Sequence, residues 1–257
     1  MKTTKQPTDA LAPVTVGRHT LICGESLAVM RAMPSRSFNV VVADPPYCSA
    51  IRGGSQKQSS AKKYTTSDAA RQFEEFLGDG RDQRSFLLWC TLWLSECWRL
   101  IDDGGAVLVF CDYRNLAAMI DAVQAGGLIF DGVVPWVKPN SRPRLGWFQT
   151  SRVEYVVVGR RGSTVSDVRK MGPACLHGMP PMNRTHPTQK HVDTITQLIA
   201  FREDWQRVLD PFGGFGTTAC AAESLGRSSV TIEQSSHYFG LSVYRLRGVV
   251  NAVPEAA

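Results

Sequence analysis

The sequence predicts an α/β fold in which helices cover both faces of one sheet, and two observations support this. Short apolar runs alternate along the chain with segments of helical periodicity. The chain has 257 residues, 43% of them hydrophobic, and no low-complexity segment divides it. That length is enough for one large core. We therefore expect a single domain over 1–257.

Each predicted element follows from its hydrophobic period. Short apolar runs bounded by polar residues or glycine are expected to be strands at 19–23, 39–43, 106–110, 129–136, 153–158, 207–210 and 229–233. Segments with apolar residues three or four apart are expected to be helices at 85–100, 112–125, 191–201, 217–225 and 235–250. In the first helix Phe86, Trp89 and Trp93 favour core packing over a dimer face.

Three segments do not fit the alternation. Residues 1–15 are polar and contain prolines, so a flexible N-terminus is expected. Residues 49–68 contain two glycines, five serines and four basic residues without an apolar period, which predicts a mobile loop. Residues 138–185 are broken by prolines and glycines and are rich in arginine. The last two segments are solvated surface loops or parts of a binding surface.

Composition narrows the classes of partner. The 29 basic and 23 acidic residues give a net charge of +6, which favours an anionic partner, with a merely basic soluble protein as the alternative. The seven cysteines form no CxxC pair, so no zinc site, other metal site or disulfide framework is expected. No signal peptide opens the chain, and no apolar run reaches the roughly 18 residues of a membrane helix. A cytoplasmic protein without membrane contact is expected.

A glycine-rich turn follows the strand predicted at 207–210. The strand ends at Asp210, the turn PFGGFG follows, and a helix is predicted from Thr217. Such a turn brings the backbone close to the carboxyl edge of the sheet, where open α/β sheets bind ligands. The next strand ends at Glu233, and an acid there can hold ribose hydroxyls. The turn contains no lysine, so a P-loop site for a triphosphate is not expected.

The strand predicted at 39–43 runs into Asp44-Pro45-Pro46-Tyr47. An exocyclic amine on a nucleobase is a poor nucleophile, because its lone pair is delocalised into the ring. Two hydrogen-bond acceptors that hold the hydrogens of the amine direct the lone pair away from the ring, which makes the nitrogen a better nucleophile. The Asp44 carboxylate is one, and the Pro45 carbonyl, held rigid by Pro46, is the other. Tyr47 offers a face on which the base can stack. These four residues are the candidate catalytic residues for transfer to an amine.

With these motifs the sequence resembles the β class of DNA amino-methyltransferases, which use S-adenosylmethionine. Asp44 to Tyr47 match the family's catalytic DPPY, and DPFGGFGTT at 210–218 matches its cofactor motif. HPTQK at 186–190, Trp136-Val137-Lys138 and EYVVV at 154–158 resemble further family segments. The catalytic motif comes before the cofactor motif, which is the order of the β class. The resemblance covers roughly 19–247.

The resemblance implies a Rossmann-like class I methyltransferase fold, with a circularly permuted mixed sheet of seven strands. It implies that S-adenosylmethionine is bound by Asp210, Pro211, Phe212, Gly214, Gly216, Thr217, Glu233, Thr188 and Lys190. For Lys190, a structural ion pair at a helix start is the alternative. The sequence departs from the family pattern at Glu25, His191 and Phe215, where Gly-Asp, proline and a small residue are usual.

The resemblance also indicates the substrate. DPPY goes mostly with the N6 atom of adenine, whereas enzymes for the N4 atom of cytosine more often have serine in place of the aspartate. The base lies inside double-stranded DNA and must be flipped out. Arg52, Lys57, Lys62 and Lys63 in the 49–68 loop are expected to contact phosphates.

Sequence choice is expected from residues 138–185, the predicted target-recognition region. Its candidate DNA contacts are Lys138, Arg142 and Arg144, because arginine binds guanine edges with two hydrogen bonds. A homodimer would enlarge this footprint. Methyltransferases of RNA or of protein glutamine are alternatives, but their motifs usually come in the reverse order. An inactive DNA-binding module is a further alternative, but such a module is expected to have lost DPPY or the glycines, and both are intact.

Overall fold

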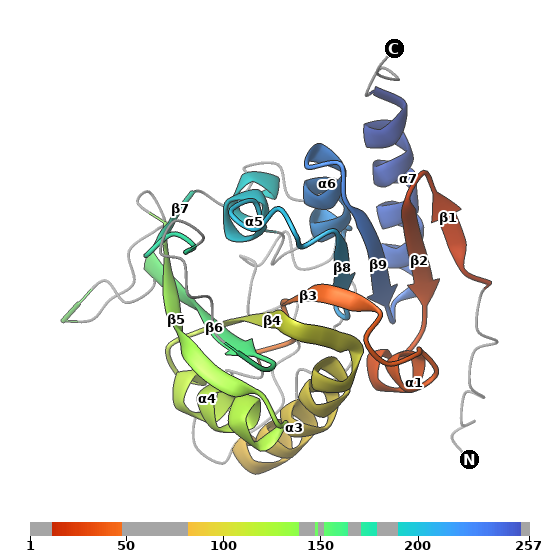
Figure 1. Cartoon of the computed structure of the whole chain (residues 1–257). Helices are drawn as coiled ribbons and strands as arrows, with labels where there is room; N and C mark the ends of the chain where they lie inside the picture. Colours follow the sequence, from red (N-terminus) through yellow and green to blue (C-terminus); the bar gives the residue numbers. More distant parts are fainter. Residues whose placement is uncertain are drawn as a thin grey trace, which may run out of the picture.

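The computed structural model describes residues 12–47, 82–138, 147–148, 152–163, 171–178 and 190–252. In these residues, one sheet lies between two layers of helices (Figure 1). The strands are β1 (Val14–Val16), β2 (His19–Cys23), β3 (Phe38–Ala43), β4 (Ile101–Cys111), β5 (Ile129–Val137), β6 (Val153–Arg160), β7 (Leu176–His177), β8 (Arg207–Asp210) and β9 (Ser228–Glu233).

The strand order is β1-β2-β9-β8-β3-β4-β6-β5-β7. Strands β2, β9, β8, β3 and β4 are parallel to one another, whereas β6 runs antiparallel to both β4 and β5. The sheet is therefore mixed. Because the carboxyl ends of β3, β8 and β9 meet at the same edge, the residues that follow these three strands come together.

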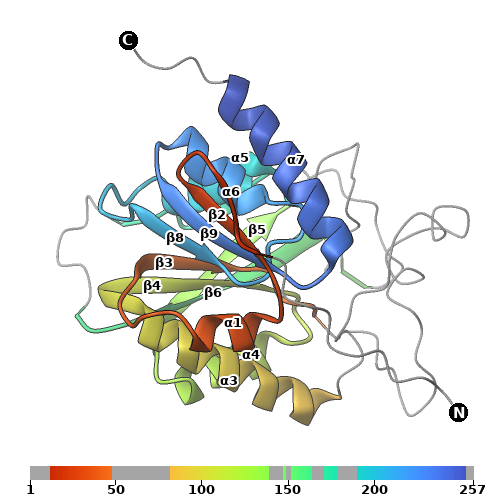
Figure 2. The same ribbon diagram turned by 90° about the vertical axis from the view of Figure 1, so that its right-hand side faces the viewer.

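Helices cover both faces of the sheet, as predicted. They are α1 (Ser26–Arg31), α3 (Gln83–Leu100), α4 (Leu116–Ala125), α5 (Val192–Ile199), α6 (Thr217–Ser224) and α7 (Ser236–Ala252). Figure 2 shows α1, α3 and α4 on one face and α5, α6 and α7 on the other. The first layer packs around Trp93 and Met119, and the second around Trp136 and Ile195. This arrangement buries both faces of the central strands.

Two helices begin at acidic caps. The Asp82 side chain accepts the backbone N–H groups of Arg84 and Ser85, and this cap begins α3. The Glu25 side chain accepts those of Leu27 and Ala28 in the same way at the start of α1. Such caps satisfy N–H groups that have no partner within the helix. Glu25, a departure from the family pattern, thus has a local structural role.

All seven predicted strands are present, but the count of seven is too low, since the described residues also form β1 and β7. The N-terminus was expected to be flexible over 1–15, but Val14 and Thr15 belong to β1, where Val14 pairs with Leu21. The prediction is therefore wrong for these two residues. The five predicted helices are present, and α1 was not predicted. The circular permutation stays a prediction.

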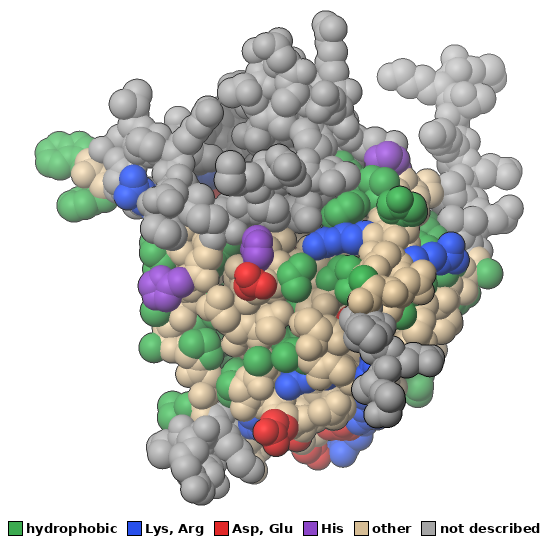
Figure 3. Space-filling view, turned by 90° about the horizontal axis from the view of Figure 1, so that it is seen from above, with side chains coloured by type: hydrophobic (Ala, Val, Ile, Leu, Met, Phe, Trp, Pro, Cys, Tyr) green, Lys and Arg blue, Asp and Glu red, His purple; other side chains and the backbone are tan. Residues whose placement is uncertain are grey.

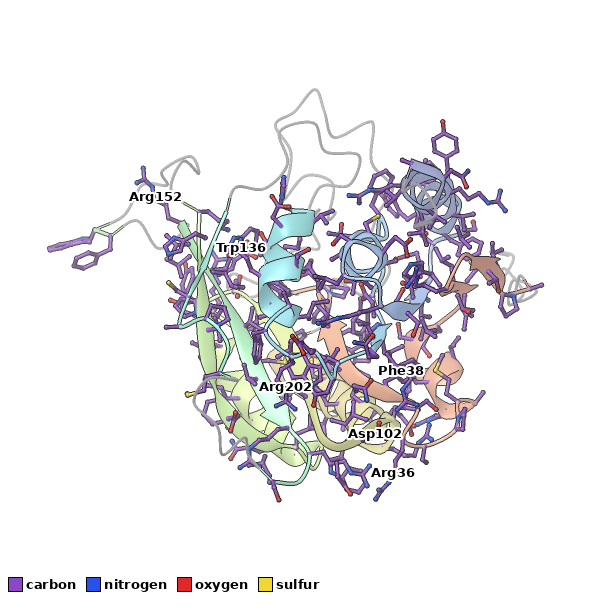
Figure 4. All side chains as sticks on the ribbon, turned by 45° about the horizontal axis from the view of Figure 1, so that its top comes forward. Arg36, Phe38, Asp102, Trp136, Arg152 and Arg202 are labelled. Carbon is purple, nitrogen blue, oxygen red and sulfur yellow. The ribbon has the colours of Figure 1, made fainter. Side chains whose placement is uncertain are left out.

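Figure 4 shows Trp136 and Arg152 at the upper left, whereas Arg36, Phe38 and Asp102 lie at the lower right. Phe38 and Asp102 are at the starts of the central strands β3 and β4. From above, the described surface mixes hydrophobic, basic and acidic side chains (Figure 3). None of the helices in the described ranges has both the length and the hydropathy needed to cross a membrane.

Candidate active site

The turn after β3 is held by side chains on both sides. The Tyr47 hydroxyl donates a hydrogen bond to Oδ1 of Asp44 at 2.8 Å, and Oε2 of Glu154 lies 3.2 Å from the same hydroxyl. The Asn115 side-chain amide donates to the Tyr47 carbonyl. Asn115 precedes α4, so this helix helps to fix the turn. The Asp44 side chain keeps 24% of its surface exposed, which leaves it accessible to a substrate.

Lys190, directly before α5, reaches into this turn. Its Nζ lies 2.9 Å from Oδ1 of Asp44, 3.0 Å from the Tyr47 hydroxyl and 3.2 Å from Oε2 of Glu154. The other oxygen of Glu154, Oε1, pairs with Nζ of Lys138 at 2.6 Å. Both lysines are buried. We call Asp44, Tyr47, Lys138, Glu154 and Lys190 the charged cluster.

Burial and mutual attraction set the protonation of the charged cluster. Burial raises the pKa of Asp44, the Lys190 ammonium opposes this rise, and the Glu154 carboxylate adds to it. Burial works in the same direction on Glu154, but Lys190 and Lys138 hold its pKa at about 2. Burial favours the neutral form of Lys190, yet the two carboxylates outweigh it and raise its pKa. Glu154 and Lys190 therefore each stabilise the ionised form of the other, while the pKa of Asp44 stays raised despite the nearby Lys190 ammonium.

Tyr47 remains a hydrogen-bond donor throughout the physiological range. Burial and the carboxylates of Asp44 and Glu154 raise the pKa of its hydroxyl well above the ordinary value. The Lys190 ammonium lies 5.3 Å from the centre of the Tyr47 ring. One side of this ring is thus directed at the cluster, and the turn is fixed by contacts at its hydroxyl, ring and carbonyl.

The second half of the site is the glycine turn, residues 211–216, between β8 and α6. Gly216 has φ +73°, a left-handed conformation in which a side chain is strained, and it is the N-cap of α6. A Cβ on Gly213 would lie 2.1 Å from Cγ2 of Thr231. Glycine at position 213 therefore lets the turn pack directly against β9.

Two acids flank the glycine turn. Asp210 accepts the backbone N–H of Phe212 at 2.9 Å. Glu233 accepts those of Gly214 at 2.7 Å and Ser235 at 2.8 Å. Burial raises the pKa of Asp210 to about 7 and also raises that of Glu233. In the described parts of the chain, no lysine or arginine forms an ion pair with either carboxylate.

Aromatic packing anchors the glycine turn to the opposite layer. The Phe212 ring lies 5.5 Å from Trp89 and 5.2 Å from Trp93, measured between ring centres, with an edge-to-face contact to Trp93. The Ser26 hydroxyl at the start of α1 donates to the Pro211 carbonyl. Helices α1 and α3 thus fix the turn, and the predicted core role of the tryptophans is confirmed for Trp93, which is fully buried.

One cavity joins the two halves of the site. Asp44 and Lys190 line it on the side of the charged cluster, and Asp210 lines it on the side of the glycine turn. Its other lining residues are Val42, Phe110, Ile195, Phe212, Gly213, Gly214, Phe215, Thr217 and Thr218. Two buried acids without a cationic partner suit a ligand that carries positive charge and hydroxyl groups. Among the described residues, no three His, Cys, Asp or Glu side chains are grouped for a metal ion.

The structure brings the predicted catalytic turn and most of the predicted cofactor residues to one edge of the sheet. Lys190 joins the catalytic group through Asp44, which favours the ion-pair alternative over the predicted contact to a cofactor carboxylate. Lys138 is buried and paired with Glu154, and its predicted contact to DNA stays a prediction. The predicted residues Thr188, Arg52, Lys57, Lys62, Lys63, Arg142 and Arg144 lie outside the described residues.

Sequence reasoning did not assign Glu154, Asn115 or Ser26 to the site. For Glu154 a signal was available, because an acid directly before the apolar run YVVV stands out in a predicted strand, and Val156 and Val157 of that run are fully buried. Asn115 and Ser26 carried no such signal, since both residue types are common near the start of any helix. The predicted recognition region also includes β6, which lies between β4 and β5 and so belongs to the scaffold of the sheet.

Comparisons with known proteins agree with this geometry. A family model for N6/N4 enzymes, described as DNA methylase, matches residues 38–170 and 163–243. The chain is 23% identical over 254 residues to the type II methyltransferase M.HinfI of Haemophilus influenzae, covering 90% of this chain and 69% of that protein. It is 22% identical over 258 residues to M.HpaI of Haemophilus parainfluenzae, covering 90% and 75%.

Solved structures show the same fold. The complex of M1.HpyAVI with S-adenosylmethionine is similar with a TM-score of 0.63 and 20% identity, over 89% of this chain and 98% of that one. The cytosine-N4-specific PvuII DNA methyltransferase is similar with a TM-score of 0.67 and 16% identity, over 92% and 93%.

Proposed function

Because the chain belongs to the family of N6/N4 DNA methylases, we propose that it transfers a methyl group to the N6 atom of adenine in double-stranded DNA. Family membership makes it a DNA amino-methyltransferase that depends on S-adenosylmethionine. The choice of adenine over cytosine is the finer proposal. The observation that carries it is the Asp44 carboxylate at the end of β3, held at one edge of the cavity.

The carboxylate suits the amine of a base. Asp44 accepts one hydrogen of the amine and the Pro45 carbonyl accepts the other, which directs the nitrogen lone pair away from the ring. The Tyr47 ring supports the flipped base by stacking. A second carboxylate close to the amine is Glu154, but it is occupied by the two lysines. Asp44 is therefore the acid that remains available to the substrate.

The residues around the glycine turn fit the cofactor. We propose that the Phe212 ring and the backbone of the glycine turn border the adenosine of S-adenosylmethionine, and that Glu233 accepts hydrogen bonds from its ribose hydroxyls. Asp210, buried without a cationic partner, favours the positively charged end of the molecule. When bound, the cofactor supplies an electrophilic methyl group on a sulfonium. The protein contributes the shape of the cavity and the two acids.

Duplex DNA is the proposed partner, with a homodimer as the proposed form of the enzyme. Trp147 is 99% exposed and Phe148 is 80% exposed, in a segment whose sequence neighbours include Arg142 and Arg144. Exposed aromatic rings next to arginines suit stacking on bases beside a phosphate backbone. This supports a role for the predicted target-recognition region. Analytical ultracentrifugation with and without duplex DNA tests the dimer.

Transfer of a labelled methyl group to duplex DNA, followed by digestion and mass identification of the nucleosides, tests the function. N6-methyladenine is the expected product. N4-methylcytosine would keep the reaction class but overturn the choice of base. Transfer to RNA but not to DNA would overturn the substrate class. If the protein binds DNA and S-adenosylmethionine yet transfers no methyl group to any of many DNA sequences, it is an inactive binding module.

A further inference from the structure

The contacts of Asp44 are distributed unequally between its two oxygens. Lys190 and Tyr47 both donate to Oδ1, at 2.9 and 2.8 Å. Among the residues that the structure describes, Oδ2 accepts no hydrogen bond. Two donors on one oxygen fix the rotation of a carboxylate, because each constrains the direction of the same lone pairs. One oxygen is thus held by the protein, and the other is left for a ligand of the cavity.

Lys190 is also shared between two acids. Its Nζ lies 2.9 Å from Asp44 and 3.2 Å from Glu154, while Glu154 has a second cation in Lys138 at 2.6 Å. The two carboxylates and two ammonium groups balance. A lysine paired with Asp44 alone would largely neutralise that carboxylate and weaken it as a hydrogen-bond acceptor. Because Lys190 is also paired with Glu154, it neutralises Asp44 less, and Asp44 remains a strong acceptor.

We propose that Lys190 and Glu154 are positioning residues for the reaction. Lys190 holds Oδ1 of Asp44 so that Oδ2 accepts a hydrogen of the substrate amine, and Glu154, fixed by Lys138, limits how strongly Lys190 neutralises Asp44. The inference rests on the proposed function for the identity of the amine. In this proposal Lys190 pairs with Asp44 and Glu154 and not with the carboxylate of the cofactor. It also gives β6 a part in catalysis through Glu154.

The titration of Asp44 in the protein without ligand tests the electrostatic half of the proposal. The ionisable groups that act on Asp44 come from every neighbouring element and are Tyr47, Cys111, Glu154, Lys190 and Asp210. Burial raises the pKa of Cys111 to about 12, and Tyr47 titrates far above neutrality, so both stay neutral. The charge of Asp44 contributes to the raised pKa of Asp210, so the signals of both carboxyl groups are followed and fitted together in every variant.

Carbon-13 NMR of labelled aspartate carboxyls measures this titration, with the Asp44 signal assigned by its loss in Asp44→Asn. Lys190→Met removes a cation, so the pKa of Asp44 should rise. Glu154→Gln removes an anion, so the pKa of Asp44 should fall. Lys190→Arg keeps the charge and should leave the titration near that of the wild type. Shifts of the same sign in the first two variants, or no shift in either, would overturn the proposal.

A matched control separates this effect from a general loss of packing. Arg227 is buried and donates to the carbonyls of Ile199 and Arg202, away from the charged cluster. Arg227→Met also removes a buried cation, so it should lower the melting temperature without moving the Asp44 titration. A shift of the Asp44 titration in this variant as large as that in Lys190→Met would show that the effect is not specific to the cluster.

Kinetics and cofactor binding test the positioning half. Lys190→Met should lower kcat by about 100-fold, because Oδ2 is no longer held in the productive direction. Its affinity for S-adenosylmethionine, measured by calorimetry, should stay within about threefold, and Lys190→Arg should recover part of kcat. A loss of cofactor affinity as large as the loss of kcat would overturn the proposal in favour of a cofactor contact. If the wild type methylates no adenine, the proposed function fails, and the carboxyl titration still decides how Asp44 is held.

Discussion

The charged cluster and the glycine turn lie at the same edge of the sheet, yet they treat buried acids in opposite ways. In the cluster, Glu154 is paired with two lysines and its pKa falls to about 2. Beside the glycine turn, Asp210 is held only by hydrogen bonds within the described residues, and burial raises its pKa to about 7. The carboxyl group of Glu154 is thus stabilised as an anion, whereas that of Asp210 titrates near neutral pH.

The difference matches the charge of the ligand that we propose for each half. The amine of a base is neutral and brings no charge to the cluster, so the cations that pair with its two carboxylates are lysines of the chain itself. S-adenosylmethionine carries a sulfonium and an ammonium group, so an uncompensated carboxylate near the glycine turn gains a partner when the cofactor binds. A buried acid without a cation costs stability in the free protein and increases affinity for a cationic ligand.

The largest expected effect separates the two halves directly. Asp44→Ala should reduce methyl transfer by at least about 1000-fold, since the acceptor for the amine hydrogen is lost. Cofactor affinity should stay within a few fold, because Asp44 lies on the side of the charged cluster. Single-turnover methyl transfer and calorimetry measure the two quantities. Equal losses in both would show that the halves are not functionally distinct.

Asp210→Asn tests the opposite half and should weaken S-adenosylmethionine binding by about 10- to 100-fold while preserving DNA affinity. The wild-type affinity should also rise as the pH increases through about 7, because Asp210 must lose its proton to attract the cation. In Asp210→Asn this rise should be absent. Calorimetric titrations of both proteins between about pH 6 and about pH 8 measure it, and parallel curves would contradict the role of Asp210.

The same carboxyl makes a prediction of opposite sign for stability. Its folded pKa of about 7 is above the ordinary value of 3.8, so the folded protein binds the extra proton between these values. The free protein should therefore lose stability as the pH rises through this window, and Asp210→Asn should lose less. Thermal unfolding without cofactor measures this difference. If the melting temperature of the free wild type rises between about pH 5 and about pH 7 relative to Asp210→Asn, the carboxyl is not destabilising when ionised.

Gly213→Ala tests whether stability and cofactor binding depend on the close packing of the glycine turn against β9. The added Cβ would meet Thr231 at 2.1 Å, so the variant should lose about 1–3 kcal/mol of stability and bind cofactor less well. Gly240→Ala in α7 is the matched control, because nothing lies within 4 Å of its Cβ position. That change should be neutral or stabilise by up to about 1 kcal/mol. Urea unfolding of both variants decides, and equal effects would remove the packing explanation.

The smallest effect concerns a surface outside both halves. Trp147→Ala should weaken DNA binding by at least about fivefold, the loss of one stacking contact, without changing cofactor affinity. Tyr244→Ala is the control, because Tyr244 on α7 is also an aromatic residue with 80% exposure. Fluorescence anisotropy with labelled duplex measures both. The same affinity for the wild type and both variants would exclude Trp147 from the DNA interface.

Much of the fold can be predicted from local sequence patterns, whereas the charged cluster cannot, because its contacts join residues that are far apart in the sequence. Strand β3 contains the apolar run VVVA, and in β9 Val230 and Ile232 alternate with polar residues, so both strands are visible in the sequence. Strands β1 and β7 have three and two residues and depend on their neighbours for pairing, so no period reveals them. Lysine is usually exposed, and the burial of Lys138 depends on Glu154, a partner on another strand.

The shared lysine has a consequence for how such sequences can diverge. Replacing Asp44 by serine alone would leave Lys190 and Lys138 opposite a single carboxylate, with one uncompensated buried charge. A lineage that changes its catalytic residue in this way must then change a lysine or gain an acid nearby. Substitutions at positions 44, 138, 154 and 190 are therefore expected to be inherited in combinations that conserve the net charge of the group.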